Sequence, residues 1–372
     1  IYMNEEERRR QIAKDNLKLL EAQNVDVRKA LQTELENMQI QKIQKVTIND
    51  PKLQLEKVRS RLVPTCVTLT DTDVVVGTKD GSVISYTREL KHIQTVAGQR
   101  TVQKHPKLPT SYKQYFGDQY EFHHGPVLSL EFNKQLISAS HNCCLLPGKS
   151  FHAQKTSCAA LTQQLLFVGA NKQIYVANIQ DKMVMHNLIG HVDTIKQIVP
   201  LPLSNQFLSA STDQSLRLFD YEAQSQLIYL ADSPLECCFA FNNEWFVAGG
   251  EALYLFNRQK RNYSQKITFQ GGFMDTLVNC CSGVYQYQVL AVGMKNKILI
   301  FELDNDSLKE VRQIDVEGFV NDICCKLIGN QIVCSFVVGG ERKCDRLEVL
   351  KTDKKVGIFV LGEVEIKKGR WK

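Results

Sequence analysis

The segment 190–220 constrains the fold of this chain more than any other part of the sequence. It opens on Gly190-His191, closes on Phe219-Asp220, and carries a polar turn at Asp213 between two short apolar runs. Apolar runs of this length, bounded by turn residues, favour β-strands. We therefore expect an antiparallel hairpin. Because one hairpin cannot bury its own apolar faces, we also expect similar units beside it.

The order of these residues resembles a WD repeat, with Phe219-Asp220 standing where the Trp-Asp dipeptide usually stands. The resemblance implies that Asp213 accepts a hydrogen bond from His191, and that His191 in turn contacts Ser209 and Phe219. Phenylalanine has no side-chain N–H, so the network would lack the donor that an indole supplies. The alternative is an ordinary antiparallel hairpin with a buried aromatic side chain.

Further copies along the chain support the WD-repeat interpretation. Strand–turn–strand units recur every 40–45 residues or so, which is roughly the period of a four-stranded propeller blade. The central strands of the repeated units are expected at 74–78, 136–140, 166–170, 207–211, 246–250, 290–293 and 334–339. The unit at 136–140 is the weakest copy, because its following strand is short. The sequence therefore predicts an all-β fold, a seven-bladed WD-repeat β-propeller over residues 51–362 with an N-terminal α-helical extension.

The parts outside the repeats are charged. Residues 1–50 are predicted to form an N-terminal helical arm, in which Asn4 suits the N-cap and the apolar stripe is narrow. The insertion 99–125 interleaves basic and aromatic residues, which suits either RNA binding or, the reading we favour, packing onto the ring. Residues 363–372 form a basic tail. For ring closure, 356–361 is favoured over 53–59 as part of the last blade.

The twelve cysteines include four adjacent pairs in predicted strands. Adjacent strand residues point to opposite faces, so each pair places at most one thiol in a given layer between blades. We expect reduced thiols that pack as small apolar groups in a cytosolic or nuclear compartment. A zinc site is the weaker alternative, because the spacing of its ligands would fit no usual pattern. Its ligands would come from His123, His124, Cys143, Cys144, His152 and Cys158. No cofactor is predicted.

Composition excludes some classes of protein. No apolar run approaches the ~20 residues that span a bilayer, so no membrane partner is expected. The charged start is unlike a signal peptide, and the first residue, Ile1, suggests a piece of a longer chain. Asp80 and Asp213 occupy turns, and the sequence shows no cluster of carboxylates or histidines suited to a propeller hydrolase. We therefore expect no enzymatic activity and no small-molecule substrate.

The arrangement as a whole resembles the WD-repeat protein of the U3 small nucleolar ribonucleoprotein, which binds U3 snoRNA at its box B/C region. A charged helical segment before a propeller is the first similarity. Gly318-Phe319-Val320-Asn321 is similar to the Gly-Phe-Ile-Asn that opens the last blade in that family. Residues 338–346 are similar to the family's stretch Gly-Gln-Glu-His-Arg-Leu-Gly-Arg. Within it Arg342 replaces a histidine, Asp345 replaces a glycine, and Leu347-Glu348 replaces an aromatic pair.

In that family a basic loop of the last blade reads the RNA. The resemblance therefore implies RNA-binding roles in the loop for Glu341, Arg342, Lys343 and Arg346. Apart from the resemblance, the basic tail suits phosphate contacts from Lys367, Lys368 and Arg370, and the alternative is a disordered tail. Arginine offers a planar fork for phosphate or base edges, and we expect Glu341 to orient an arginine. The alternative is a solvated loop whose charges keep a strand edge from pairing.

The resemblance implies a non-catalytic RNA-binding scaffold of the U3 snoRNP and the small-subunit processome. Such a protein would work in the nucleus, in the nucleolus, during pre-rRNA processing. Its partners would be U3 snoRNA, a kink-turn-binding snoRNP protein and other small-subunit processome proteins. The alternative function is a WD-repeat platform for protein–protein interaction, an adaptor for complex assembly without specific RNA binding.

Overall fold

The computed structural model describes residues 56–59, 62–97, 116–117, 123, 125–141, 143–146, 149–162, 164–180, 183–201, 204, 206–220, 225–260, 262–343 and 349–363. The predicted N-terminal arm 1–50, most of the 99–125 insertion and the tail from 364 onward lie outside the described residues. The described strands all belong to one unit, Thr47–Glu363. No helix among them is long and apolar enough to cross a membrane.

The described residues are almost entirely β-structure. Every strand pairs antiparallel with its neighbours, as expected for short apolar runs joined by tight turns. The first sheet contains β2 (Pro64–Leu69), β3 (Asp73–Thr78), β4 (Val83–Thr87) and β5 (His92–Ala97). The second contains β7 (Val127–Asn133), β8 (Gln135–Ser140), β9 (Cys143–Leu146), β10 (Lys149–His152) and β6 (Phe116–Gly117). The third contains β11 (Thr156–Leu161), β12 (Leu165–Ala170), β13 (Gln173–Asn178) and β14 (Met183–Ile189).

The next sheets repeat the same order. The fourth contains β15 (Ile195–Pro200), β16 (Gln206–Ser211), β17 (Ser215–Asp220) and β18 (Ser225–Leu230). The fifth contains β19 (Cys237–Ala240), β20 (Trp245–Gly249), β21 (Ala252–Asn257) and β22 (Tyr263–Thr268). A short helix, α2 (Phe273–Thr276), precedes the sixth. The sixth contains β23 (Cys280–Val284), β24 (Val289–Gly293), β25 (Lys295–Asp304), β26 (Ser307–Ile328), β27 (Gln331–Lys343), β28 (Val349–Glu363) and β1 (Glu56–Arg59).

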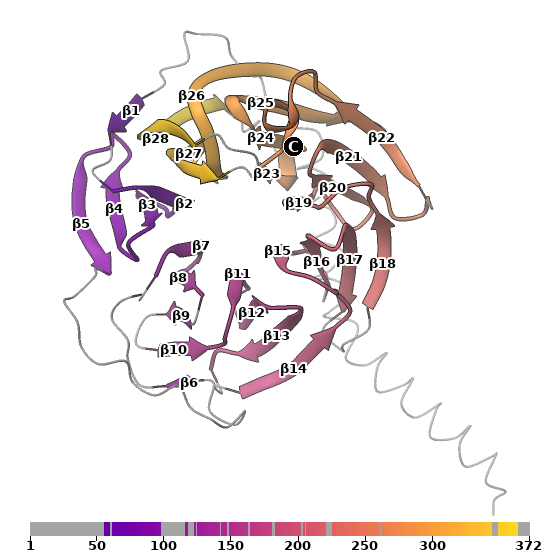
Figure 1. The fold of residues 1–372 in the computed structure, drawn as a ribbon, viewed down its shortest axis with the longest axis horizontal. Helices are drawn as coiled ribbons and strands as arrows, with labels where there is room; N and C mark the ends of the chain where they lie inside the picture. Colours follow the sequence, from indigo (N-terminus) through magenta and orange to yellow (C-terminus); the bar gives the residue numbers. More distant parts are fainter. Residues whose placement is uncertain are drawn as a thin grey trace, which may run out of the picture. The chain divides into compact units, whose positions relative to one another are not determined.

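These sheets surround a common axis, as Figure 1 shows. The innermost strands contact one another in a closed cycle, which runs through β2, β7, β11, β15, β19, β23 and β26 and returns to β2. Apolar side chains from neighbouring sheets share each layer of the core. One cluster joins Cys238 and Phe246 of the fifth sheet to Leu208 and Leu218 of the fourth. The predicted all-β WD-repeat propeller is confirmed.

The number of separate sheets is six, so the prediction of seven separate blades is wrong. The cause is β26, which runs unbroken through two four-stranded arrays of the sixth sheet. Its first part, up to Phe319, pairs with β25, and its second part, from Val320, pairs with β27. In the other sheets a loop separates the outermost strand of one array from the innermost strand of the next. Here hydrogen bonding continues across that junction.

Both candidate segments take part in closing the ring. Residues 356–361 lie in β28, and β1 pairs with β28 along its outer edge, with Glu56 opposite Ile358 and Arg59 opposite Lys355. The last array therefore combines strands from the two ends of the propeller. This pairing ties strands about 300 residues apart, and closure of the ring removes the exposed edges at which an open array would otherwise end.

A repeated contact between cysteine and glycine fixes the spacing of the arrays. In four arrays a cysteine on the innermost strand pairs with a glycine on the next strand: Cys66 with Gly77, Cys158 with Gly169, Cys237 with Gly249, and Cys280 with Gly293. A Cβ on Gly169 would lie 2.6 Å from the Sγ of Cys158. The same sulfur lies 3.7 Å from the carbonyl oxygen of Ile195 in the next array. Position 169 therefore requires glycine, because the Cys158 sulfur comes too close to leave room for a Cβ atom.

We expect Gly169→Ala to lower the free energy of unfolding by about 1–3 kcal/mol, because the added methyl group overpacks the contact with Cys158. The double variant Gly169→Ala/Cys158→Ala should be more stable than the sum of the single changes, by about 1 kcal/mol. Urea unfolding measures both quantities. Gly125→Ala is the control, because a Cβ there would meet nothing within 4 Å. Additive single changes would show that the contact is not the cause.

All described cysteines are free, and the adjacent pairs separate as predicted. Cys237 packs in the core between the fifth and sixth sheets, whereas Cys238 packs between the fourth and fifth. Among the cysteines that the structure describes, Cys324 alone is half-buried and the others are buried. Burial raises the pKa of the Cys158 thiol to about 12. The Cys158 thiol therefore stays protonated and acts as a packing group.

Candidate functional site

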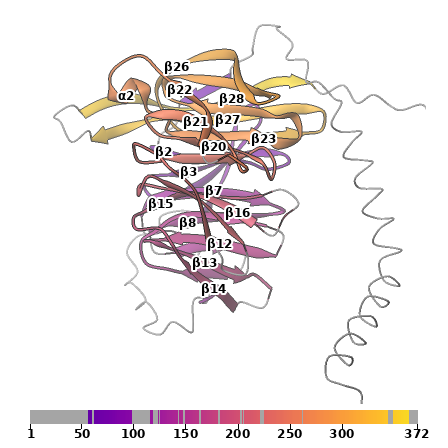
Figure 2. The ribbon, with the colours of Figure 1, turned by 90° about the vertical axis from the view of Figure 1, so that its right-hand side faces the viewer.

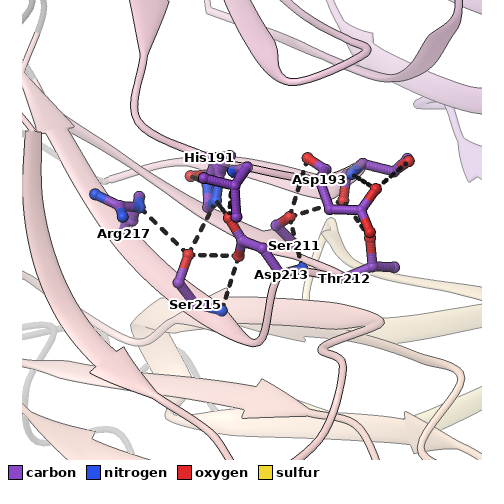
Figure 3. Close-up of polar contacts among 10 residues, drawn as sticks. His191, Asp193, Ser211, Thr212, Asp213, Ser215 and Arg217 are labelled. Atoms are coloured by element: carbon purple, nitrogen blue, oxygen red, sulfur yellow. Dashed lines mark hydrogen bonds and ion pairs between the residues drawn. The ribbon is translucent and has the colours of Figure 1, made fainter.

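His191, Asp213 and Ser215 meet in one buried network beside the fourth sheet, drawn in Figure 3. His191 follows β14, and Asp213 lies in the turn between β16 and β17. The His191 Nδ1 lies 2.9 Å from Asp213 Oδ2, and its Nε2 lies 2.7 Å from the hydroxyl of Ser209. Both the His191 and Asp213 side chains are buried from solvent. The network therefore fixes the turn and presents no reactive group at the surface.

The Asp213 carboxylate accepts several further hydrogen bonds. Its donors are the backbone N–H of Val192 at 2.8 Å, the backbone N–H of Ser215 at 2.9 Å and the Ser215 hydroxyl at 2.5 Å. Burial by itself raises the pKa of Asp213, but these hydrogen bonds and His191 outweigh it and bring the pKa down to about 2. Burial lowers the pKa of His191, although Asp213 opposes that change. A neutral His191 that donates from Nδ1 and accepts at Nε2 satisfies the network.

Phe219 contributes packing to this network. Its ring lies 6.1 Å from the imidazole of His191 and stacks on Phe207 at 5.3 Å. Phe207 in turn contacts Phe167 of the third sheet at 4.8 Å. The aromatic column thus links two neighbouring sheets, and it supplies by burial what the missing indole N–H would supply by hydrogen bonding.

A second histidine network, which sequence reasoning missed, lies in the second sheet. His123 is fully buried, and its Nε2 lies 2.7 Å from the Ser138 hydroxyl, as the His191 Nε2 does from Ser209. Its Nδ1 lies 3.6 Å from the sulfur of Cys143. The sequence signal was the shared Ser-Ala-Ser of β8 and β16, each preceded by a histidine. No group of three potential metal ligands occurs among the described residues, and His124 lies outside them.

The predicted RNA-binding stretch lies at the end of a long hairpin. β27 pairs with β26 only as far as Val338, and β1 covers β28 only from Lys355 onward. Between these limits β27 and β28 pair with each other alone, with Glu341 opposite Lys351, Arg342 opposite Leu350 and Lys343 opposite Val349. In Figure 2 the yellow ends of this hairpin reach past the neighbouring sheets. Arg346, Lys367, Lys368 and Arg370 lie outside the described residues.

The motif at 318–321 holds the base of that hairpin. The Asn321 side-chain amide donates to the carbonyl of Pro64 in β2, at 3.0 Å, and to that of Gly339 in β27, at 2.5 Å. Gly318 adopts a φ of 102°, and its N–H donates to the Asn296 side chain at 2.8 Å. Phe319 is buried. This motif therefore joins the first array, the last array and the start of the hairpin.

Polar side chains of the innermost strands line an axial cavity of about 190 Å³. Glu131 of β7 and Asp322 of β26 both contribute, and burial raises the pKa of each to about 7. The charge of Asp322 raises the pKa of Glu131 further, whereas Lys326 opposes the rise. Backbone N–H groups of Val67 and Ile323, each 2.9 Å from an oxygen of Asp322, oppose the rise for Asp322.

This cavity predicts a pH dependence of stability. The pKa of Asp322 is higher in the folded protein than in the unfolded chain, so its favourable contribution is present at low pH and is lost as the pH rises through about 7. We expect the thermal midpoint of Asp322→Asn, relative to wild type, to rise as the pH is raised from about 5.5 to 8.5. Calorimetry measures the difference. Exposed Asp306→Asn is the control, and a pH-independent difference for Asp322→Asn would contradict the assignment.

Comparisons with known proteins agree with the fold. The structure of U3-55K is similar to this chain, with a TM-score of 0.68 and 17% sequence identity. The match covers 82% of this chain and 98% of the U3-55K chain. The WD40 repeats of RRP9 are similar over 83% of this chain and 100% of their own, also with a TM-score of 0.68 and 17% identity. The WD40 propeller domain of Doa1 follows, with a TM-score of 0.59, 13% identity, and coverage of 82% and 96%.

At the level of sequence, no protein-family model matches this chain, and no curated protein matches it either. The similarity to the solved structures therefore establishes the fold. The protein is an all-β propeller of the WD40 type, and its contact between His191 and Asp213 is the one that the WD-repeat resemblance implied.

Proposed function

We propose that this protein is a non-catalytic WD-repeat scaffold that binds U3 snoRNA at its box B/C region in the nucleolus. It would do so with a kink-turn-binding snoRNP protein and other small-subunit processome proteins, during pre-rRNA processing. The proposal is supported by the sequence resemblance to the U3-specific WD-repeat protein and by the fold shared with U3-55K. Under this proposal the arm 1–50 and the tail 363–372 supply additional contacts outside the ring.

The β27–β28 hairpin is the observation that carries the proposal. Arg342 and Lys343 lie on a two-stranded extension that has no role in closing the ring. Between 339 and 355 the sequence has six Lys or Arg and four Asp or Glu, a local excess of two positive charges. Its base is fixed by Asn321. A basic loop on a rigid support suits recognition of a folded RNA, because cations bind phosphate while the support fixes their positions.

Sequencing of co-purified RNA tests this function. The tagged full chain would be crosslinked in cells, purified, and its bound RNA sequenced. We expect strong enrichment of one small RNA, U3, with crosslinks in the box B/C region, and loss of that enrichment in the variant Arg342→Ala/Lys343→Ala/Arg346→Ala. Co-purification of a defined set of proteins without an enriched RNA would instead support the protein–protein interaction platform.

A further inference from the structure

A strongly basic turn joins β21 and β22 at the outer rim of the fifth sheet. Residues 257–274 contain four Lys or Arg and no Asp or Glu. β21 and β22 are the third and fourth strands of their array, whereas β27 and β28 are the second and third strands of the last array. Successive turns of an antiparallel array lie at opposite ends of its strands, so this turn and the tip of the β27–β28 hairpin lie on opposite faces of the ring. The hairpin site therefore leaves this charge unexplained.

A groove of about 470 Å³ lies between this turn and β18 of the fourth sheet. Figure 1 shows β18 and β22 on the same side of the ring. The turn contributes Arg258, Gln259, Lys260 and Asn262, and all of these except Arg258 are exposed. No carboxylate occurs among the described residues that line the groove. Its accessible groups are therefore cations and side-chain amides, which bind phosphates and base edges.

The exposed leucines of β18 do not face this groove. Leu227 pairs with Arg217 in the register of β17 and β18. Leu230 pairs with Ser215, whose hydroxyl lies 3.0 Å from Nδ1 of His191 on the third-sheet side. Arg217 donates to that same hydroxyl at 3.3 Å. Directly paired residues share one face of a sheet, so both leucines point away from the groove, and a protein partner would find no apolar anchor on its β18 wall.

The cations of the turn are held in place by contacts with their surroundings. The Asn257 carbonyl accepts a hydrogen bond from the backbone N–H of Lys260 at 3.0 Å. The Arg258 guanidinium donates to the Gln206 side chain at 3.0 Å, which uses one of its five N–H donors. The Lys260 ammonium lies 5.8 Å from the centre of the Trp245 ring. Because both cations are fixed in advance, less order has to be created when a phosphate backbone binds.

Tyr263 provides an aromatic surface beside the basic turn. Its ring centre lies 6.0 Å from that of Tyr229 and 5.9 Å from that of Tyr254, and the rings of Tyr263 and Tyr229 meet at 85°. Tyr263 is nevertheless 39% exposed. A ring that two neighbours hold in place and that solvent still reaches can stack on an unpaired base. Cations next to an exposed aromatic ring are the combination that binds single-stranded RNA.

We propose that the β21–β22 turn, with Tyr263 beside it, is a second RNA-binding site that takes an unpaired RNA segment. Arg258 and Lys260 bind phosphates, Tyr263 stacks on a base, and the amide of Asn262 meets a base edge. RNA is favoured over an acidic protein segment because the groove has no exposed apolar wall, and because lysine is depleted in protein interfaces. The inference does not rest on the role proposed for the hairpin, since the two sites share no residue and lie on opposite faces of the ring.

Fluorescence anisotropy with a labelled oligouridine of 12 nucleotides tests this site. The full chain carries the three alanine substitutions at the hairpin throughout, so that the hairpin does not contribute. We expect Tyr263→Ala to weaken binding by about tenfold, because one stacked base is lost, whereas Tyr263→Phe keeps the ring and the affinity. Arg258→Gln/Lys260→Gln should make the slope of log Kd against log salt shallower by about 1.4, since two phosphates are no longer neutralised.

Each change has a matched control elsewhere on the ring. Tyr285→Ala removes a tyrosine that is 40% exposed, in the turn between β23 and β24. Lys91→Gln/Lys172→Gln removes the same charge from two exposed lysines of the first and third sheets. Neither control should change the affinity by more than about twofold, because distant charges are screened. Equal losses in the site variants and their controls would overturn the proposal, and so would unchanged binding in the site variants.

An oligoglutamate of the same length separates RNA from an acidic protein segment. If it binds as tightly as the oligouridine and loses as much affinity in Tyr263→Ala, the surface is a protein-binding site and the proposal is wrong. Thermal midpoints show whether the variants remain folded. Should Tyr263→Ala lower the midpoint, because its ring packs on Tyr229, the salt slope of Arg258→Gln/Lys260→Gln still decides between the outcomes.

Discussion

Replacing Asp213 with alanine is expected to lower the free energy of unfolding by about 3–5 kcal/mol, because it removes the charged centre of a buried network. The backbone N–H groups of Val192 and Ser215 would lose their acceptor, as would the imidazole of His191. The thermal midpoint should fall by roughly 5–10 °C in a domain of this size. Asp213→Asn keeps the shape and one acceptor oxygen, so its loss should be intermediate.

Asp193 provides the matched control for this change. It lies two residues from His191 and is exposed, and its carboxylate accepts hydrogen bonds only from Thr194 among the described residues. Asp193→Ala should therefore change the free energy of unfolding by less than about 0.5 kcal/mol. Differential scanning calorimetry of the two variants gives the comparison. Equal losses for both variants would show that the buried network contributes little to the stability of the fold.

The variant Arg342→Ala/Lys343→Ala/Arg346→Ala is expected to weaken binding to the U3 box B/C RNA by about 10³-fold, because each of three lost charge-assisted contacts costs about 1.5 kcal/mol. The slope of log Kd against log salt should also become shallower by about 2, since three fewer phosphates would be neutralised. Filter binding between about 50 and 200 mM salt measures both quantities.

The control has the same change in net charge at distant positions. Lys91→Ala/Lys172→Ala/Lys309→Ala removes three exposed lysines from the first, third and sixth sheets. Its affinity for the RNA should stay within about threefold of wild type, because long-range attraction is screened at physiological salt. If both triple variants lose the same affinity, binding depends on total charge, and the hairpin has no specific role.

Much of the strand framework could be predicted from local patterns. The central strands and the turn at Asp80-Gly81 were placed by short apolar runs between turn residues, and the structure has strands at each. The His191 network could be predicted because its members follow one another within a single repeat. His123 was missed because the turn that follows its Ser138 carries no aspartate. Cys143 stands beside that histidine instead.

The candidate RNA site, too, could be predicted only in part from the sequence. Its residue types could be taken from the sequence resemblance, whereas the extension of β27 and β28 beyond their neighbours could not. That extension depends on where β26 and β1 stop pairing, and the end of one strand does not specify the end of its partner.

The sequence by itself determined the repeat, because short apolar runs and turn chemistry act within a few residues of each other. Tertiary structure decided how the ring is divided and closed. The innermost strands have similar lengths and similar mixtures of apolar and polar side chains, so their edges are chemically nearly equivalent, and the choice among them is made by packing. The continuous pairing of β26 across two arrays, and the addition of β1 to β28, are such choices. Each depends on the whole ring being assembled.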